Sequence, residues 1–132
     1  MNKTICAAFG SLAFLALVLP VRAVNPVRVM ILDGESGGPY HDWQHVTPVL
    51  KKELEDAGLF KVDVVTAPQS SDDFSAFNLD FSRYQVVVLN YDGQDWPAKL
   101  KASFENYIKD GGGLVIVHAA DNAFPIGRAL TR

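Results

Sequence analysis

The residues of this chain that are best suited to chemistry are histidines placed near the ends of apolar segments. His118 directly follows the apolar residues 114–117, and Asp121 stands three residues further on. His41 closes a loop rich in glycine that follows another apolar segment, residues 27–33. An imidazole titrates near neutral pH, so it can exchange a proton with a substrate or bind a metal. We predict His118 as an acid–base catalyst or ligand, His41 as its partner, and Asp121 as the carboxylate that orients His118.

Other roles for the histidines remain open at the level of the sequence. His41 and His45 are four residues apart, a spacing at which two histidines of one helix can share a metal ion. No third ligand accompanies them, so we predict a substrate contact by His41 and no metal site. Both His41 and His118 have a structural alternative, His41 at the start of a helix and His118 as a residue that holds a loop by a backbone hydrogen bond.

Polar and aromatic side chains near these segments are suited to binding a sugar. Asn90, Tyr91 and Asp92 stand at the end of a third apolar run, where we expect them to contact the substrate. Their alternative is a plain turn, because an Asp-Gly pair is a turn signal. Trp43 and Trp96 could each stack on a sugar ring, although packing in the core is the alternative for both. We retain Trp43 as a substrate-binding candidate.

Four apolar segments predict the strands that must position these side chains: residues 27–33, 60–65, 84–90 and 114–117. One amphipathic helix separates the first strand from the second, and another separates the third strand from the fourth. Buried strands that alternate with helices predict an α/β fold, a three-layer flavodoxin-like parallel sheet with strand order 2-1-3-4. Such sheets bind ligands beyond the carboxyl ends of their strands, and the candidate residues follow those ends or lie near them.

The two helices are predicted from apolar side chains that share one face. For the first helix, Thr47 and Pro48 predict the start, Asp42 is an alternative cap, and Gly58 marks the end. The second helix is expected to start near Pro97. The apolar face of the first helix consists of Val46, Leu50, Leu54 and Ala57, and that of the second consists of Leu100, Phe104 and Ile108. The polar segment between the second and third strands is expected to be held to the core by Phe74, Phe77 and Phe81.

Residues 1–23 have the pattern of a secretory signal peptide. Residues 1–3 are positive, residues 5–19 are apolar, and Ala23 ends a small-x-small cleavage site. The apolar run is too short for a membrane-spanning helix, which needs about 18 residues or more. We therefore expect a secreted or periplasmic protein that has no stable membrane anchor after cleavage and whose domain spans residues 24–132.

Cysteine content argues against a disulfide-stabilised domain, and charge argues against a nucleic-acid-binding protein. The single cysteine, Cys6, lies in the predicted signal peptide, so the remaining domain forms no disulfide. The formal net charge of the chain is −3, and no basic cluster is present. Nucleic acid is therefore excluded as the partner, because phosphate binding depends on Lys and Arg.

Three stretches of the chain resemble the ThuA-like (trehalose utilisation) family: VRVMILDGESGGPYHDWQH, FSRYQVVVLNYDGQDWP and FENYIKDGGGLVIVHAADNAF. The family belongs to the class I glutamine-amidotransferase-like superfamily, and the resemblance covers about residues 27–125. It implies the flavodoxin-like fold and a role in carbohydrate metabolism, on trehalose, a related sugar or a keto-sugar. The implied partner is a small-molecule sugar, and no cofactor follows from the resemblance.

The resemblance also shows where this chain departs from its superfamily. In glutamine amidotransferases the strand that corresponds to residues 114–117 leads into a reactive cysteine, whereas His118 follows that strand here. A thiolate mechanism is thus not implied. Members of the family are longer, and residues 126–132 do not follow the family pattern, so we expect a C-terminally truncated domain whose fourth strand is an apolar edge. The alternatives to an enzyme are a non-catalytic carbohydrate-binding or interaction module and an inactive truncated remnant.

Overall fold

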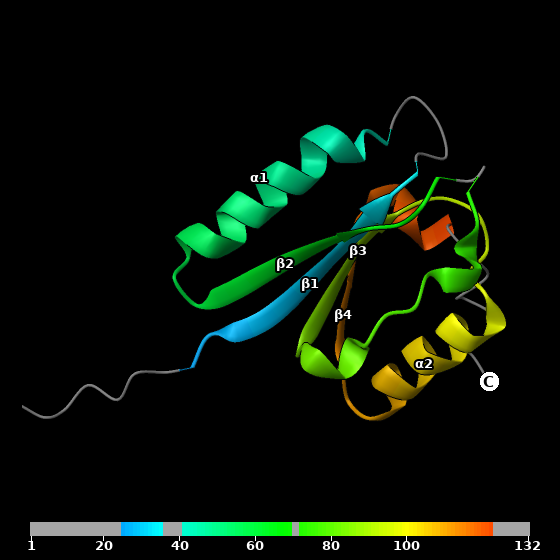
Figure 1. The fold of residues 1–132 in the computed structure, drawn as a ribbon. Coiled ribbons are helices and arrows are strands. Elements are labelled where there is room, and N and C mark those ends of the chain that lie inside the picture. The colour runs from blue at the N-terminus through cyan, green and yellow to red at the C-terminus, as the bar shows by residue number, and fades with distance from the viewer. Residues whose placement is uncertain (1–24, 36–40, 70–71, 123–132) are drawn as a thin grey trace, which may run out of the picture.

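The computed structural model describes residues 25–35, 41–69 and 72–122. Its four strands form one parallel sheet in the order β2-β1-β3-β4, with α1 on one face and α2 on the other (Figure 1). The predicted α/β fold, its three layers and the strand order 2-1-3-4 are confirmed. The elements are β1 (Val27–Gly34), α1 (Trp43–Asp56), β2 (Phe60–Thr66), β3 (Val86–Tyr91), α2 (Ala98–Lys109) and β4 (Gly113–Ile116).

The central strand β1 separates two hydrophobic clusters. Successive side chains of a strand point to opposite faces of the sheet. Val29 and Ile31 therefore belong to the cluster under α1, whereas Met30 and Leu32 belong to the larger cluster on the side of α2. All four side chains are almost fully buried, which explains why β1 reads as a continuous apolar run rather than an alternating one.

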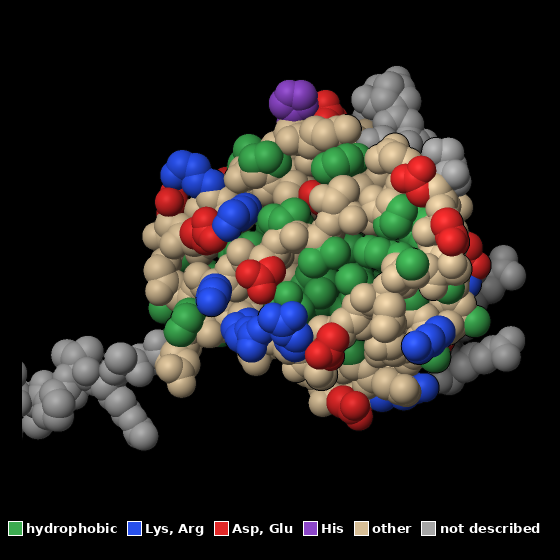
Figure 2. All heavy atoms as spheres, in the orientation of Figure 1, with side chains coloured by type: hydrophobic (Ala, Val, Ile, Leu, Met, Phe, Trp, Pro, Cys, Tyr) green, Lys and Arg blue, Asp and Glu red, His purple; other side chains and the backbone are tan. Residues whose placement is uncertain are grey.

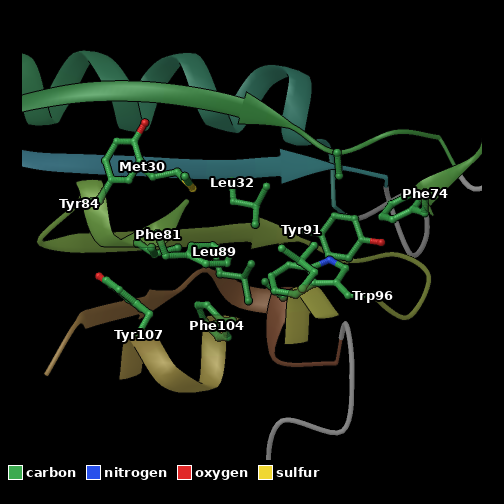
Figure 3. Packing of buried hydrophobic residues seen from close by; sticks show 14 residues of the cluster. Met30, Leu32, Phe74, Phe81, Tyr84, Leu89, Tyr91, Trp96, Phe104 and Tyr107 are labelled. Atoms are coloured by element: carbon green, nitrogen blue, oxygen red, sulfur yellow. The ribbon is translucent and has the colours of Figure 1, made fainter. Parts of the chain in front are cut away.

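The larger cluster is mainly aromatic (Figure 3). The ring of Phe81 lies 5.2 Å from that of Phe104, 5.9 Å from that of Tyr107 and 6.3 Å from that of Trp96, measured between centroids. Aromatic pairs at such distances stabilise a core beyond the area that they bury. Trp96 is thus a core residue, in line with the packing alternative given for it above.

The segment between β2 and β3 is anchored by two short 3₁₀ helices. Phe74 of η1 (Phe74–Ala76) and Phe81 of η2 (Phe81–Arg83) are buried, and Phe77 is half-buried against the same cluster. The prediction that phenylalanines pin this segment is confirmed. Figure 2 shows hydrophobic side chains in a hollow between β2 and this segment. The segment therefore leaves some of the apolar surface beside β2 uncovered.

The start of α1 differs from the first of its two predicted positions. The helix begins at Trp43, and Asp42 is its N-cap, with a side chain that accepts a hydrogen bond from the backbone N–H of His45 (3.3 Å). The side-chain hydrogen bond with His45 also lowers the pKa of Asp42 below its usual value. Prediction of a start at Thr47 and Pro48 was wrong because Asp42 already caps the free N–H groups of the first turn.

The buried face of α1 is also rotated relative to the predicted one. Thr47 is buried, and Leu50 and Leu54 pack against the sheet, whereas Val46 is exposed and Ala57 lies beyond the helix as its C-cap. The polar Thr47 faces the sheet because it meets a buried polar partner there, as described below. A search for apolar residues alone could not have placed it on this face.

The remaining boundaries lie close to the predicted ones, and the edge of the sheet is apolar as expected. β3 starts two residues later than predicted and includes Tyr91, and the other strands differ by one residue. Among the described residues β4 pairs only with β3, and its Val115 and Ile116 are 50% and 39% exposed. Residues 1–23 and 126–132 lie outside the described part of the chain.

The described segments contain no helix that is long and apolar enough to cross a membrane.

Replacement of Phe81 by Ala tests the aromatic core. The variant leaves a cavity among three rings, so we expect the free energy of unfolding to fall by about 3–5 kcal/mol. Phe77→Ala is the matched control, because Phe77 is half-buried and comes from the same segment. Urea denaturation of both variants measures the difference, and equal losses would show that Phe81 is not the anchor of this segment.

Candidate functional site

Buried polar side chains gather at the carboxyl ends of β1 and β3. Asp33 and Asn90 are register partners on these neighbouring strands, so their side chains point to the same face of the sheet, the face that α1 covers. Asp33 is 1% exposed and Asn90 is fully buried, and His41, which precedes α1, is 5% exposed. Polar groups are rarely buried in this way without a structural partner or a ligand.

Two hydrogen bonds tie this group to α1 and to the segment before it. The side-chain amide of Asn90 donates to the hydroxyl of Thr47 (3.0 Å), which is the polar partner that draws Thr47 to the buried face. Nε2 of His41 lies 3.3 Å from the carbonyl oxygen of Asn90. Because a carbonyl only accepts, Nε2 is the ring nitrogen that donates in this contact. The structure thus brings together His41 and Asn90, two of the predicted site residues.

Three buried oxygen atoms of this region have no hydrogen-bond partner among the described residues: Oδ1 of Asp33, Oε1 of Glu35 and Oδ1 of Asn90. All three atoms are acceptors, and two belong to carboxylates. A buried acceptor without a donor is costly to keep. The oxygens of Asp33 and Asn90 lie on the α1 face of the sheet, whereas that of Glu35 lies on the other face, so only the first two can belong to one group of acceptors.

Glu35 lies on the opposite face of the sheet edge, where Tyr91 is located. Oε2 of Glu35 accepts a hydrogen bond from the backbone N–H of Gln94 (2.8 Å), and the Tyr91 hydroxyl donates to the carbonyl oxygen of Gln94 (2.6 Å). Burial, with a smaller contribution from the charge of Glu35, raises the pKa of Tyr91, so this hydroxyl keeps its proton. Gly93 permits the contact, because a Cβ atom there would lie 2.1 Å from Oε2 of Glu35.

Tyr91 has a different setting from the one expected. It ends β3 rather than starting a loop, and it is fully buried in the aromatic cluster. The alternation of β3 explains this position, since a residue next to the α1-facing Asn90 must face the α2 side. Asp92, the next residue, is half-buried.

His118 occupies a strained turn directly beyond β4. Its φ angle is 45°, its side chain is exposed, and it begins the 3₁₀ helix η3 (His118–Asn122). The backbone N–H of Val117 donates to the carbonyl oxygen of Leu89 (2.9 Å), which holds this turn beside β3. Apart from glycines, His118 and Glu35 (φ 42°) are the described residues with positive φ, and both follow strand ends at the same edge. Such strain is concentrated at functional sites.

Two further predicted residues lie near this edge without a contact that defines their role. Asp121 is exposed in η3, and within the described chain no hydrogen bond or ion pair joins it to His118. Trp43, at the first position of α1, is half-buried. The roles predicted for them, orientation of His118 by Asp121 and sugar stacking by Trp43, stay predictions.

The two histidines near the start of α1 have separate surroundings. Nδ1 of His45 lies 2.7 Å from Oδ2 of Asp42 on the exposed side of the helix, whereas His41 is buried against β3. In the described ranges no group of three or more His, Cys, Asp or Glu side chains is placed to hold a metal ion.

The sequence puts Asp33 and Glu35 at the edge where such sheets bind ligands but assigns them no specific role, and it gives Thr47 a role only as a helix cap. Asp33 and Glu35 follow the apolar core of β1, and Thr47 lies inside an amphipathic helix. A signal for Asp33 was present, since a carboxylate at the end of a fully buried strand is unusual. No sequence signal distinguished Thr47, because its burial depends on the tertiary contact with Asn90.

Comparisons with known proteins agree with the resemblance found in the sequence. The family model ThuA, described as trehalose utilisation, matches residues 28–127. The solved structure of a ThuA-like protein from Parabacteroides merdae ATCC 43184 is 46% identical, with a TM-score of 0.71. This match covers 76% of the present chain and 35% of that chain, so the present chain spans about a third of its length. No curated protein matches the chain.

The strain at His118 is testable by comparing two substitutions that both remove the imidazole. Glycine adopts positive φ without a steric cost, whereas alanine retains the Cβ atom. We expect His118→Gly to be more stable than His118→Ala by about 1 kcal/mol. Chemical denaturation provides the measurement, and an alanine variant as stable as the glycine variant would contradict a strained backbone at this position.

Proposed function

We propose, from the premise that this chain belongs to the ThuA (trehalose utilisation) family, that it binds and processes a sugar at the carboxyl edge of its sheet. The observation that carries the proposal is the exposed His118 on a strained turn beyond β4. In α/β enzymes a sharp strand-to-helix turn of this kind presents the reactive side chain to the substrate. An imidazole on such a turn is suited to proton transfer near neutral pH.

The surrounding residues support a sugar as the substrate. His41 is held by the contact of its Nε2 with the carbonyl oxygen of Asn90, which leaves Nδ1 as the ring nitrogen without a partner in the described structure. The unpartnered oxygens of Asp33 and Asn90, neighbours at the ends of β1 and β3, suit a ligand rich in hydroxyl donors. In this proposal His118 exchanges a proton with the sugar, His41 assists it, and Asn90 and Asp92 bind hydroxyl groups. Asp121 orients His118 after a side-chain rotation.

Glutamine amidotransferase activity is not part of the proposal. That chemistry needs a thiolate nucleophile, and the turn beyond β4 carries His118 rather than a cysteine. The one cysteine of the sequence, Cys6, belongs to the segment with the signal-peptide pattern.

A non-catalytic sugar-binding module is the second candidate. The specific observation in its favour is that no hydrogen bond joins Asp121 to His118 among the described residues, so the imidazole has no carboxylate to orient it. A binding module needs only the acceptor atoms and an aromatic surface such as Trp43. The two candidates differ in whether the sugar is converted.

Substitution of His118 by Ala separates the two candidates. In an enzyme, loss of the acid–base group lowers kcat by about 10²–10⁴-fold and leaves sugar binding in place. Product formation from trehalose, glucose and a keto-glucoside is followed by NMR, and binding by isothermal titration calorimetry.

His45→Ala is the matched control, because His45 is an exposed histidine of α1 that contacts only Asp42 in the described structure. We expect this variant to retain turnover. Unchanged turnover in His118→Ala would contradict the catalytic role of His118, and sugar binding without turnover in the unmodified chain would favour the module.

We further propose that the protein is exported and that cleavage follows Ala23. Expression of the full chain in a bacterial host tests this, with N-terminal sequencing of the protein recovered from the periplasm. The expected first residue is Val24. An intact N-terminus on protein that remains in the cytoplasm would contradict export.

A further inference from the structure

A pocket of about 370 Å³ opens between the first turns of α1 and the ends of β1 and β2. It is lined by Asp33 of β1, by Trp43 and Thr47 of α1, and by Val64 and Thr66 of β2. None of its lining residues comes from β3, β4 or η3. The pocket is therefore separate from the His118 turn, although it lies on the same carboxyl edge of the sheet.

Asp33, which lines this pocket, carries a carboxylate oxygen without a partner. The residue is 1% exposed, and its Oδ1 atom has no hydrogen-bond partner in the described structure. No described Lys, Arg or His side chain forms an ion pair with it. An unpaired buried carboxylate opposes folding. A ligand in the pocket that donates a hydrogen bond to Asp33 would remove this cost.

Charge narrows the class of ligand. The Asp33 carboxylate repels an anion. A metal ion is disfavoured because, among the described residues, Asp33 is the only carboxylate that lines the pocket and because the ammonium of Lys51 lines it as well. That ammonium is engaged by Glu55 and by the carbonyl oxygen of Val62 (3.4 Å). The same ammonium disfavours an organic cation, so the class that remains is a neutral ligand with several hydroxyl donors.

We propose that this pocket holds one ring of the sugar, with Asp33 as the acceptor that selects for a hydroxyl pair. The inference rests on the proposed function and adds to it the place and the recognition chemistry. Half-buried Trp43 offers an apolar ring face, and Thr47, Thr66 and the amide of Gln44 offer donors and acceptors. The volume is at the small end of the range for ligand pockets, which suits a single pyranose ring.

Replacement of Asp33 by Asn in the full chain is the decisive variant. Asparagine has nearly the same shape but lacks the charge. We expect binding of glucose and trehalose, measured by calorimetry, to weaken about 10-fold or more, because a hydrogen bond to a charged acceptor is lost. We expect the Tm without sugar to rise, because an unpaired buried charge is removed. A purely structural aspartate would lower the Tm on replacement.

Two other variants complete the experiment. Asp56→Asn, at the far end of α1, removes a surface carboxylate that pairs with Lys52 and should change neither affinity nor Tm appreciably. The double variant Gln44→Ala, Thr66→Val changes two exposed lining residues and should weaken sugar binding without unfolding the protein. If the Asp33 variant does not fold, the double variant alone tests whether this pocket binds the sugar.

The outcomes distinguish the pocket from the proposed function. Weaker binding together with a raised Tm supports the pocket, as does weaker binding in the double variant. If the Asp33 variant and the double variant both bind sugar as the unmodified chain does, the proposal that this pocket binds the sugar is wrong, while the proposed function stands. A lowered Tm with unchanged affinity also overturns it, since Asp33 is then structural. No binding of either sugar by the unmodified chain overturns the pocket and the sugar-binding function together.

Discussion

The parallel pairing of β1 with β3 is the constraint on which the rest of the structure depends. Its register sets Asp33 beside Asn90 and Gly34 beside Tyr91. Because side chains alternate along a strand, a slip by one residue would move Asp33 and Asn90 to different faces. The register therefore decides that the acceptors of both strands meet under α1, and that Tyr91 joins the aromatic core.

Stability and site chemistry oppose each other at this edge. Hydrophobic clusters on both faces of the sheet supply the favourable free energy. At the strand ends the same sheet buries single carboxylate oxygens that have no hydrogen-bond partner among the described residues. His118 and Glu35 add backbone strain at positive φ. Proteins tolerate such features where a ligand or a reaction needs them. Their concentration at one edge, rather than any single residue, is the reason for placing the candidate site there.

Much of the fold and part of the site could be predicted from the sequence. The four strands read correctly because buried parallel strands are continuous apolar runs, and Phe74 and Phe81 were recognised as anchors. The start of α1 was misplaced because Thr47 and Pro48 resemble a helix start, and the cap provided by Asp42 was weighed as the alternative. Asp33 and Glu35 received no role, because the burial of a polar side chain depends on what packs over it.

The sequence by itself determined the order of strands and helices, the family to which the chain belongs, and the presence of histidines at strand ends. These properties follow from local periodicity and from residue identity along the chain. Only the tertiary structure decided which side chains meet: Asn90 with Thr47 and His41, and Glu35 with Gln94. Those contacts join residues far apart in the chain, and strand register and helix rotation set them, neither of which a local pattern encodes.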